Sequence, residues 1–145
     1  MVNLTYHDIS WLYTAQPSLT YIQGANILVG TFKFCAQYRH LEIITDSYDL
    51  VIKFNTNSVL PKVYETTGKI ARMAKVMDKP LIDFHVNLDG SLCMIREDKV
   101  FSLYKRGFDI KLFVKHLMTH LYWVSYYGTY CKAPWIAEEH GRCYL

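Results

Sequence analysis

The stretch HVNLDGSLCM, residues 85–94, organises the rest of the chain. It places an imidazole (His85), a side-chain amide (Asn87), a carboxylate (Asp89) and a thiol (Cys93) around an Asp-Gly pair that is typical of a tight turn. A thiol attacks as the thiolate, which a base or a local field must favour, and a hydrogen-bond donor must stabilise the oxyanion that develops. This one segment could supply all of these groups, so we expect Cys93 to be the reactive residue.

The composition is that of a globular protein. The chain has 145 residues, of which 51% are hydrophobic, and this is enough to bury a core. The net charge of +3 is small and the Lys and Arg residues are scattered, so we expect no nucleic-acid-binding surface. No signal-peptide pattern opens the chain and no apolar run reaches membrane-spanning length. We therefore expect a single cytoplasmic domain over residues 1–145 that does not bind a membrane.

The cysteine pattern favours free thiols over disulfides or a metal site. Without a secretory signal, disulfides are the less common state of a cysteine. No CxxC pair is present, and His116 and His120, four residues apart, lack an evident third ligand. We expect no metal and no other cofactor, and we expect free thiols at all four cysteines, which are Cys35, Cys93, Cys131 and Cys143.

The first half of the chain predicts an antiparallel sheet. Alternation over residues 27–38 indicates a strand in which Gly30 marks a bulge or a close approach. Residues 41–45 and 48–54 indicate two more strands, separated by a turn at Asp46-Ser47, and residues 63–65 indicate a short fourth one. Consecutive strands joined by short polar turns imply an α+β fold, an antiparallel β-meander flanked by helices on one face.

Helices are expected at the two ends of the chain. Residues 4–16 have loosely helical spacing, and Pro17 should end that helix. Residues 69–84 and 94–105 show no firm periodicity, and Pro80 argues against a long helix through the first of these segments. Asp109 can cap a helix with an apolar face from residue 110 to residue 121, and Gly128 is a natural stop for it.

Taken together, these features resemble the ubiquitin-conjugating (UBC-like) fold, and more closely its bacterial branch from antiphage operons such as CBASS. The likeness covers roughly residues 26–142. It rests on the meander, on LPKVYE at residues 60–65, on His85-Val86-Asn87 with Gly90 to Cys93, and on a tail with Pro134-Trp135 and His140-Gly141. The chain matches the short, stand-alone form of these proteins.

The resemblance implies a role for each residue of the motif. His85 would brace the loop, Asn87 would stabilise the oxyanion, and Cys93 would carry an acyl group as a thioester. Val86 replaces the proline of the eukaryotic motif, and the spacing from histidine to cysteine is about two residues shorter. The shorter loop leaves the role of Asn87 open, and Asp89 could instead orient or deprotonate an incoming amine. His140 could depress the thiol pKa if the tail folds back toward Cys93.

The resemblance also implies partners. A cysteine-dependent acyl transferase of this kind would act in antiphage defence on a cGAS-like nucleotidyltransferase (CD-NTase). A separate activating enzyme, with a ubiquitin-like protein, would charge it, because this chain has no Gly-rich phosphate loop. Two alternatives stay open, namely a non-catalytic module that clamps the nucleotidyltransferase and a Cys-His hydrolase with His85 or His140 as the base. Trp123, Tyr126 and Tyr127 could form a docking surface for a partner or simply pack in the core.

Overall fold

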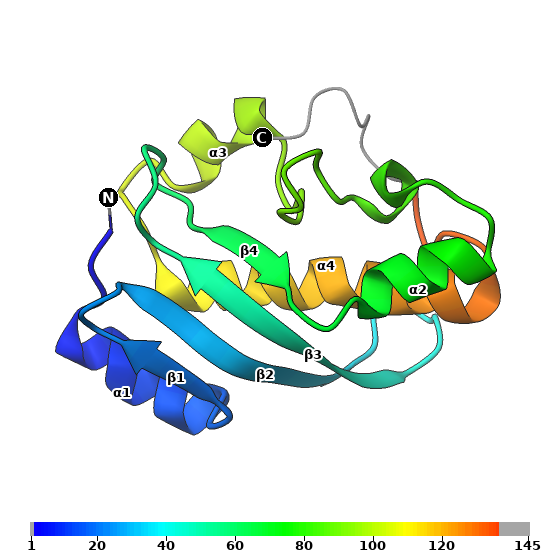
Figure 1. The fold of residues 1–145 in the computed structure, drawn as a ribbon. Helices are drawn as coiled ribbons and strands as arrows, with labels where there is room; N and C mark the ends of the chain where they lie inside the picture. The colour runs from blue at the N-terminus through cyan, green and yellow to red at the C-terminus, as the bar shows by residue number, and fades with distance from the viewer. Residues whose placement is uncertain (1, 137–145) are drawn as a thin grey trace.

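A computed structural model describes residues 2–136 of the chain (Figure 1). Its helices are α1 (Tyr6–Ala15), α2 (Lys69–Val76), the single 3₁₀ turn η1 (Leu81–Phe84), α3 (Glu97–Leu103) and α4 (Ile110–Tyr130). Its strands are β1 (Leu19–Ile22), β2 (Ile27–Ala36), β3 (Ile44–Lys53) and β4 (Lys62–Glu65). Within residues 2–136, no helix is long and apolar enough to cross a membrane.

The four strands form one antiparallel sheet in the order β1-β2-β3-β4, which confirms the expected α+β meander. Pairs such as Leu28 with Ile52 and Phe32 with Tyr48 put fully buried side chains on the same face of β2 and β3. Helix α4 runs across this face (Figure 1), while Lys33 on the alternate positions of β2 is exposed. The core therefore lies between one face of the sheet and α4.

Gly30 allows β1 to pack at the edge of the sheet. Its φ of 138° lies in a region that other residues rarely adopt, and a Cβ built there would lie 2.1 Å from the carbonyl oxygen of Ser18. That same oxygen accepts a hydrogen bond from the amide of Thr31 at 3.1 Å. The close approach predicted for Gly30 is confirmed.

The predicted turn at Asp46-Ser47 is wrong, because both residues lie inside the continuous strand β3. Asp46 faces Phe34 across the sheet, and its carboxylate accepts hydrogen bonds from Ser125 on α4 and from Lys69 on α2. Burial raises the pKa of Asp46, but the hydrogen bonds from Lys69, Ser125 and the backbone outweigh it, so the pKa is lowered overall. Tertiary partners satisfy the carboxylate that would otherwise favour a turn.

Helix α4 begins where the sequence predicts and ends later than predicted. Asp109 caps it by accepting hydrogen bonds from the amides of Lys111 and Leu112. Gly128 does not stop it, because the helix continues to Tyr130 and Cys131 takes the left-handed conformation that ends it. A Cβ at Gly128 would lie 2.4 Å from the sulfur of Met73 on α2, so this glycine lets the two helices pack closely.

One strand and two α-helices have no counterpart in the sequence-based expectation: β1, α2 and α3. Pro80 does prevent a long helix through residues 69–84, since α2 ends at Val76 and η1 begins only after the proline. These elements are only 4, 8 and 7 residues long, which is too short for a clear periodicity.

Candidate functional site

The segment 85–95 is held as an extended loop against β4. The amide of Leu92 donates to the carbonyl oxygen of Val63 at 2.8 Å, and Tyr64 forms a β-bridge with Ser91. Val86 and Leu92 form a second bridge, so the two ends of the loop run antiparallel to each other. This pairing gives Cys93 a fixed position relative to the sheet.

The turn expected from the Asp-Gly pair is confirmed. The amide of Gly90 donates to the carbonyl oxygen of Asn87 at 2.9 Å, and the amide of Asn87 donates to that of Ser91 at 2.8 Å. Gly90 has a φ of 88°, which glycine adopts readily and other residues do not. The tip residue Leu88 is 97% exposed.

Asp89 stabilises this turn through both of its carboxylate oxygens. Oδ1 accepts from the amide and the hydroxyl of Ser91 at 2.9 and 2.6 Å, and Oδ2 pairs with Nζ of Lys62 at 2.6 Å. Burial raises the pKa of Asp89, but the hydrogen bonds from Lys62 and Ser91 outweigh this effect and lower it to about 2. A carboxylate with so low a pKa is a weak base at neutral pH, so the geometry favours a structural role for Asp89.

Asn87 is turned toward Ser91. Its side-chain Nδ2 donates to the hydroxyl oxygen of Ser91 at 3.1 Å, and the residue is 4% exposed. Asn87 is not among the residues that line the pocket next to Cys93. The structure thus joins Asn87 to Asp89 through Ser91, and it does not bring the amide into the pocket as an oxyanion donor would require.

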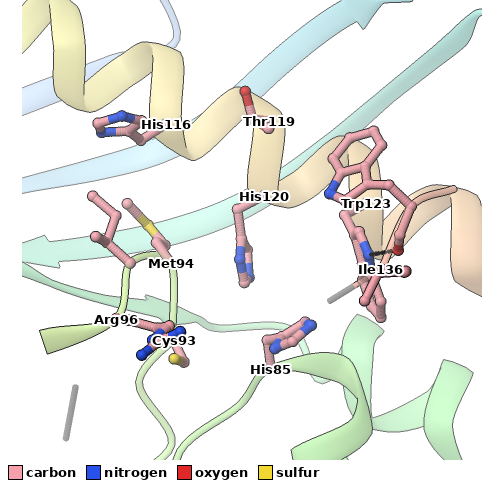
Figure 2. Close-up of a pocket in the computed structure, with 11 residues that line it drawn as sticks. His85, Cys93, Met94, Arg96, His116, Thr119, His120, Trp123 and Ile136 are labelled. Carbon is pink, nitrogen blue, oxygen red and sulfur yellow. Dashed lines mark hydrogen bonds between the residues drawn. The ribbon is translucent and has the colours of Figure 1, made fainter. Parts of the chain in front are cut away.

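A pocket of about 280 Å³ lies between the Cys93 loop and helix α4 (Figure 2). Its lining residues come from the loop, from α4 and from the segment after it: His85, Cys93, Met94, Ile95, Arg96, His116, Thr119, His120, Trp123, Trp135 and Ile136. Three histidines and one arginine thus share a pocket with the predicted nucleophile. Their grouping could not be predicted from the sequence, because α4 meets the loop only in the folded chain.

His85 lines this pocket. Its φ of 59° ends η1 in the left-handed conformation, and its carbonyl oxygen accepts the amide of Cys93 at 2.7 Å. The imidazole packs edge-on against Trp123, with ring centroids 4.5 Å apart, and edge-on against His120 at 6.0 Å. These contacts agree with the expectation that His85 braces the loop.

His120 is the most unusual group in the pocket. It is 7% exposed, and its Nε2 makes no hydrogen bond to any residue in the described range. Burial, with a further contribution from His85, lowers the pKa of His120 to about 3, so its ring is neutral at physiological pH. A buried polar atom without a hydrogen-bond partner, such as this Nε2, is rare in folded proteins and calls for an explanation.

His116, one turn before His120 on α4, has a clear partner. Its Nδ1 lies 2.8 Å from the hydroxyl of Tyr104. Burial and the charge of Lys115 lower the pKa of His116, and burial together with Asp109 raises the pKa of Tyr104 above its usual value. Both side chains are therefore neutral. No group of three potential metal ligands occurs among the described residues, and the histidine pair stays without a third ligand there.

Cys93 differs from the other cysteines of the described chain. It is 6% exposed and disulfide-bonded, whereas Cys35 and Cys131 are exposed and free. The expectation of free thiols is confirmed for Cys35 and Cys131 and is wrong for Cys93. A disulfide depends on where the fold brings two sulfur atoms and on the redox conditions, neither of which the spacing of cysteines reveals. Cys143 lies outside the described residues.

The aromatic residues near the end of α4 are packed into the molecule. Trp123 and Tyr126 are 6% and 5% exposed, and Tyr127 is half-buried against Phe84 with ring centroids 4.9 Å apart. Their burial favours core packing over a docking surface. Trp135 stacks on Tyr122 at 5.8 Å, which agrees with an anchoring role for the start of the tail. His140 lies outside the described residues.

No family model, no curated protein and no solved structure matches this chain.

Proposed function

We propose that this protein is a ubiquitin-conjugating-like acyl carrier of bacterial antiphage defence, in which Cys93 holds an acyl group as a thioester. The observation that carries the proposal is the position of Cys93, which lines a pocket and is fixed to His85 by a backbone hydrogen bond. The loop order from histidine to cysteine and the four-stranded meander are consistent with it. The proposed partner is a cGAS-like nucleotidyltransferase.

The chemistry begins with reduction, because a sulfur atom in a disulfide is not a nucleophile. A dithiol supplies two electrons and two protons, and Cys93 becomes a thiol. Its thiolate then attacks the carbonyl carbon of an acyl group that a separate activating enzyme carries as a thioester. The new bond forms to Sγ of Cys93 as the bond to the donor sulfur breaks, and the donor thiolate takes up the proton that Cys93 released.

In a second step an amine of the acceptor attacks the same carbonyl carbon. The bond to Cys93 breaks, the proton that the amine loses passes to the departing sulfur, and Cys93 returns to the thiol. His85 keeps the loop in place through both steps by its contacts with Trp123 and with the amide of Cys93. The lowered pKa of Asp89 argues against a role for it in removing the amine proton.

A second candidate is a non-catalytic module that clamps the nucleotidyltransferase and alters its activity. The low exposure and disulfide bonding of Cys93 favour this reading, since both limit the access of a substrate to the sulfur. Under this alternative Cys93 would be dispensable for the effect on the partner.

Co-expression with a CD-NTase from an antiphage operon separates the two candidates. The wild type and the Cys93→Ala variant are each co-expressed with the nucleotidyltransferase and a candidate activating enzyme and purified, and the rate at which the partner makes its nucleotide product is measured. The acyl-carrier function predicts that both proteins bind but that only the wild type alters the rate. An equal effect of both proteins would support the clamp, and Cys35→Ala, which changes a free exposed cysteine, is the matched control.

A further inference from the structure

We infer that His120 stabilises the oxyanion of the acyl transfer at Cys93, by donating a hydrogen bond from Nε2 to the carbonyl oxygen of the acyl group. This inference deepens the proposed function and rests on it, because it assigns a residue to the acyl chemistry of Cys93. The hydrogen bonds around Cys93 and the buried, unpartnered nitrogen of His120 support it.

The donors of the motif itself are engaged inside the loop. When a thiolate attacks a carbonyl carbon, negative charge develops on the carbonyl oxygen, and a hydrogen-bond donor at that position lowers the barrier. The backbone amide of Cys93 already donates to the carbonyl oxygen of His85 at 2.7 Å. The side-chain Nδ2 of Asn87 donates to the hydroxyl of Ser91 at 3.1 Å. We therefore expect the donor for the acyl oxygen to come from another element.

Helix α4 supplies several polar side chains to the pocket, and two of them donate elsewhere. The hydroxyl of Thr119 lies 3.0 Å from the carbonyl oxygen of Lys115, one turn earlier on the helix. The indole N–H of Trp123 donates to the carbonyl oxygen of Trp135 at 3.4 Å. These two contacts tie their donors to the protein backbone, away from a substrate.

His120 differs from both, because its Nε2 has no hydrogen-bond partner within residues 2–136. The residue lines the pocket together with Cys93 and is 7% exposed. Nearly all buried polar atoms in native proteins are hydrogen-bonded, because leaving one unsatisfied costs its full desolvation. In Figure 2 the ring of His120 projects from α4 toward the loop that carries His85 and Cys93. The oxygen of an acyl group on Cys93 would supply the missing partner.

The protonation state of His120 suits a donor to an oxyanion. Burial lowers the pKa of its ring to about 3, so the ring is neutral and carries one proton at physiological pH. That proton can occupy either nitrogen, and an anionic oxygen in the pocket selects the tautomer with the proton on Nε2. A neutral imidazole that donates in this way stabilises developing negative charge without losing its proton.

Bonds and charges balance in this step without a further reactant. The thiolate of Cys93 bonds to the carbonyl carbon, and the electron pair of the C=O double bond moves to the oxygen that Nε2–H contacts. The double bond re-forms as the donor sulfur leaves with its bonding electrons. The attack of the acceptor amine forms an oxyanion on the same carbonyl group, so the same contact serves both steps. His120 begins and ends each step as a neutral ring.

The test compares two reactions of the full chain after reduction and removal of the reductant. S-phenyl thioacetate acetylates a thiolate through an oxyanion, whereas iodomethane methylates a thiolate without forming one. An acid quench and the masses of peptic peptides give both modifications at Cys93 and at the exposed, free Cys35 in the same sample. We expect the ratio of acetylation to methylation to be at least about tenfold higher at Cys93 than at Cys35. This comparison needs no variant.

Variants assign the effect to His120. His120→Leu should lower the acetylation rate of Cys93 by about 10²-fold and leave its methylation rate unchanged, because only acetylation forms an oxyanion. His120→Gln should recover much of the loss, since its side-chain amide is also a donor. The exposed His40→Leu is the control and should keep the wild-type ratio. A purely structural role would change both rates together and leave their ratio unchanged.

Two results would overturn the inference: equal ratios at Cys93 and Cys35, or an unchanged ratio in His120→Leu. Neither decides the proposed function, which is tested by the acyl adduct formed with an activating enzyme and the nucleotidyltransferase. An adduct at Cys93 together with an unchanged ratio in His120→Leu would overturn this inference alone. A ratio that falls in His120→Leu, with no adduct on co-expression, would overturn only the proposed function.

Discussion

The backbone amide of Cys93 donates a 2.7 Å hydrogen bond to the carbonyl oxygen of His85, so the first residue of the motif fixes the position of its cysteine. The contact is possible because the turn at residues 87–90 brings the two ends of the loop together. The imidazole of His85, packed on Trp123, holds that end of the loop against α4. The motif is thus a closed loop whose geometry depends on packing at His85.

Replacing His85 tests whether it acts through packing. His85→Ala should lower the free energy of unfolding by about 1–3 kcal/mol, because it removes a buried ring from Trp123 and His120. His85→Phe keeps an aromatic ring there and should recover most of the loss. Chemical denaturation measures both variants. Equal destabilisation by alanine and phenylalanine would show that the imidazole nitrogens, and not the ring contacts, stabilise the loop.

Asp89 should act on stability and not as a base. Asp89→Ala removes the acceptor for the amide and the hydroxyl of Ser91 and should cost about 1 kcal/mol, whereas Lys62→Met removes a partly exposed ion pair and should cost less. The folded-state pKa of about 2 lies below the ordinary 3.8, so this stabilisation is present above pH 3.8 and is lost as the pH falls toward 2. Denaturant unfolding across this range, compared with Asp89→Ala, measures it. A variant as stable as the wild type at neutral pH would contradict the assignment.

His120 should make the protein sensitive to mild acid. Its folded-state pKa of about 3 lies below the ordinary 6.5, so the unfolded chain takes up a proton first and stability falls as the pH drops below 6.5. The loss should approach about 1.4 kcal/mol for each pH unit. His120→Leu should remove this slope and leave the protein at least as stable at neutral pH, because it deletes an unsatisfied buried nitrogen.

The free energy of unfolding of the wild type and of His120→Leu is measured from about pH 7 to about pH 5, and the difference between the two proteins is compared across this range. The range is chosen because an ordinary imidazole titrates within it. The exposed His40→Leu should keep the wild-type slope. Parallel curves for the wild type and His120→Leu would show that His120 protonates equally well in both states.

Gly128 should resist substitution because of Met73. Gly128→Ala places a Cβ 2.4 Å from the sulfur of Met73 and should destabilise by about 1–3 kcal/mol, despite the better helix propensity of alanine. Shortening the neighbour in the double variant Gly128→Ala/Met73→Ala should remove the clash and show favourable coupling. Gly24→Ala is the control, since nothing lies within 4 Å of that position. A stabilised Gly128→Ala would contradict the close packing of α2 and α4.

The sequence was a sound guide where a residue acts through its neighbours along the chain. The cap at Asp109, the turn around Gly90 and the alternation in β2 are local effects, and the structure contains all three. Asp46 and Gly128 were misjudged because their usual local preferences are overridden by contacts with other elements, namely Lys69 and Ser125 for Asp46 and Met73 for Gly128.

The residues that line the pocket are even harder to predict from the sequence. Periodicity places His116 and His120 on one helix face, but only the fold shows that this face meets the loop of Cys93. The buried state of His120 depends on that meeting. The motif therefore predicts the candidate nucleophile, whereas the chemistry of its surroundings cannot be predicted from the sequence.

The most direct test of the central claim is the intact mass of the reduced wild type and of Cys93→Ala, each co-expressed with the partner nucleotidyltransferase and a candidate activating enzyme. The account predicts an adduct on the wild type only, which hydroxylamine removes because it is a thioester. The adduct should map to the peptide that contains Cys93 and not to those with Cys35 or Cys131. Identical masses for the two proteins, apart from the substitution itself, would contradict the claim that Cys93 carries an acyl group.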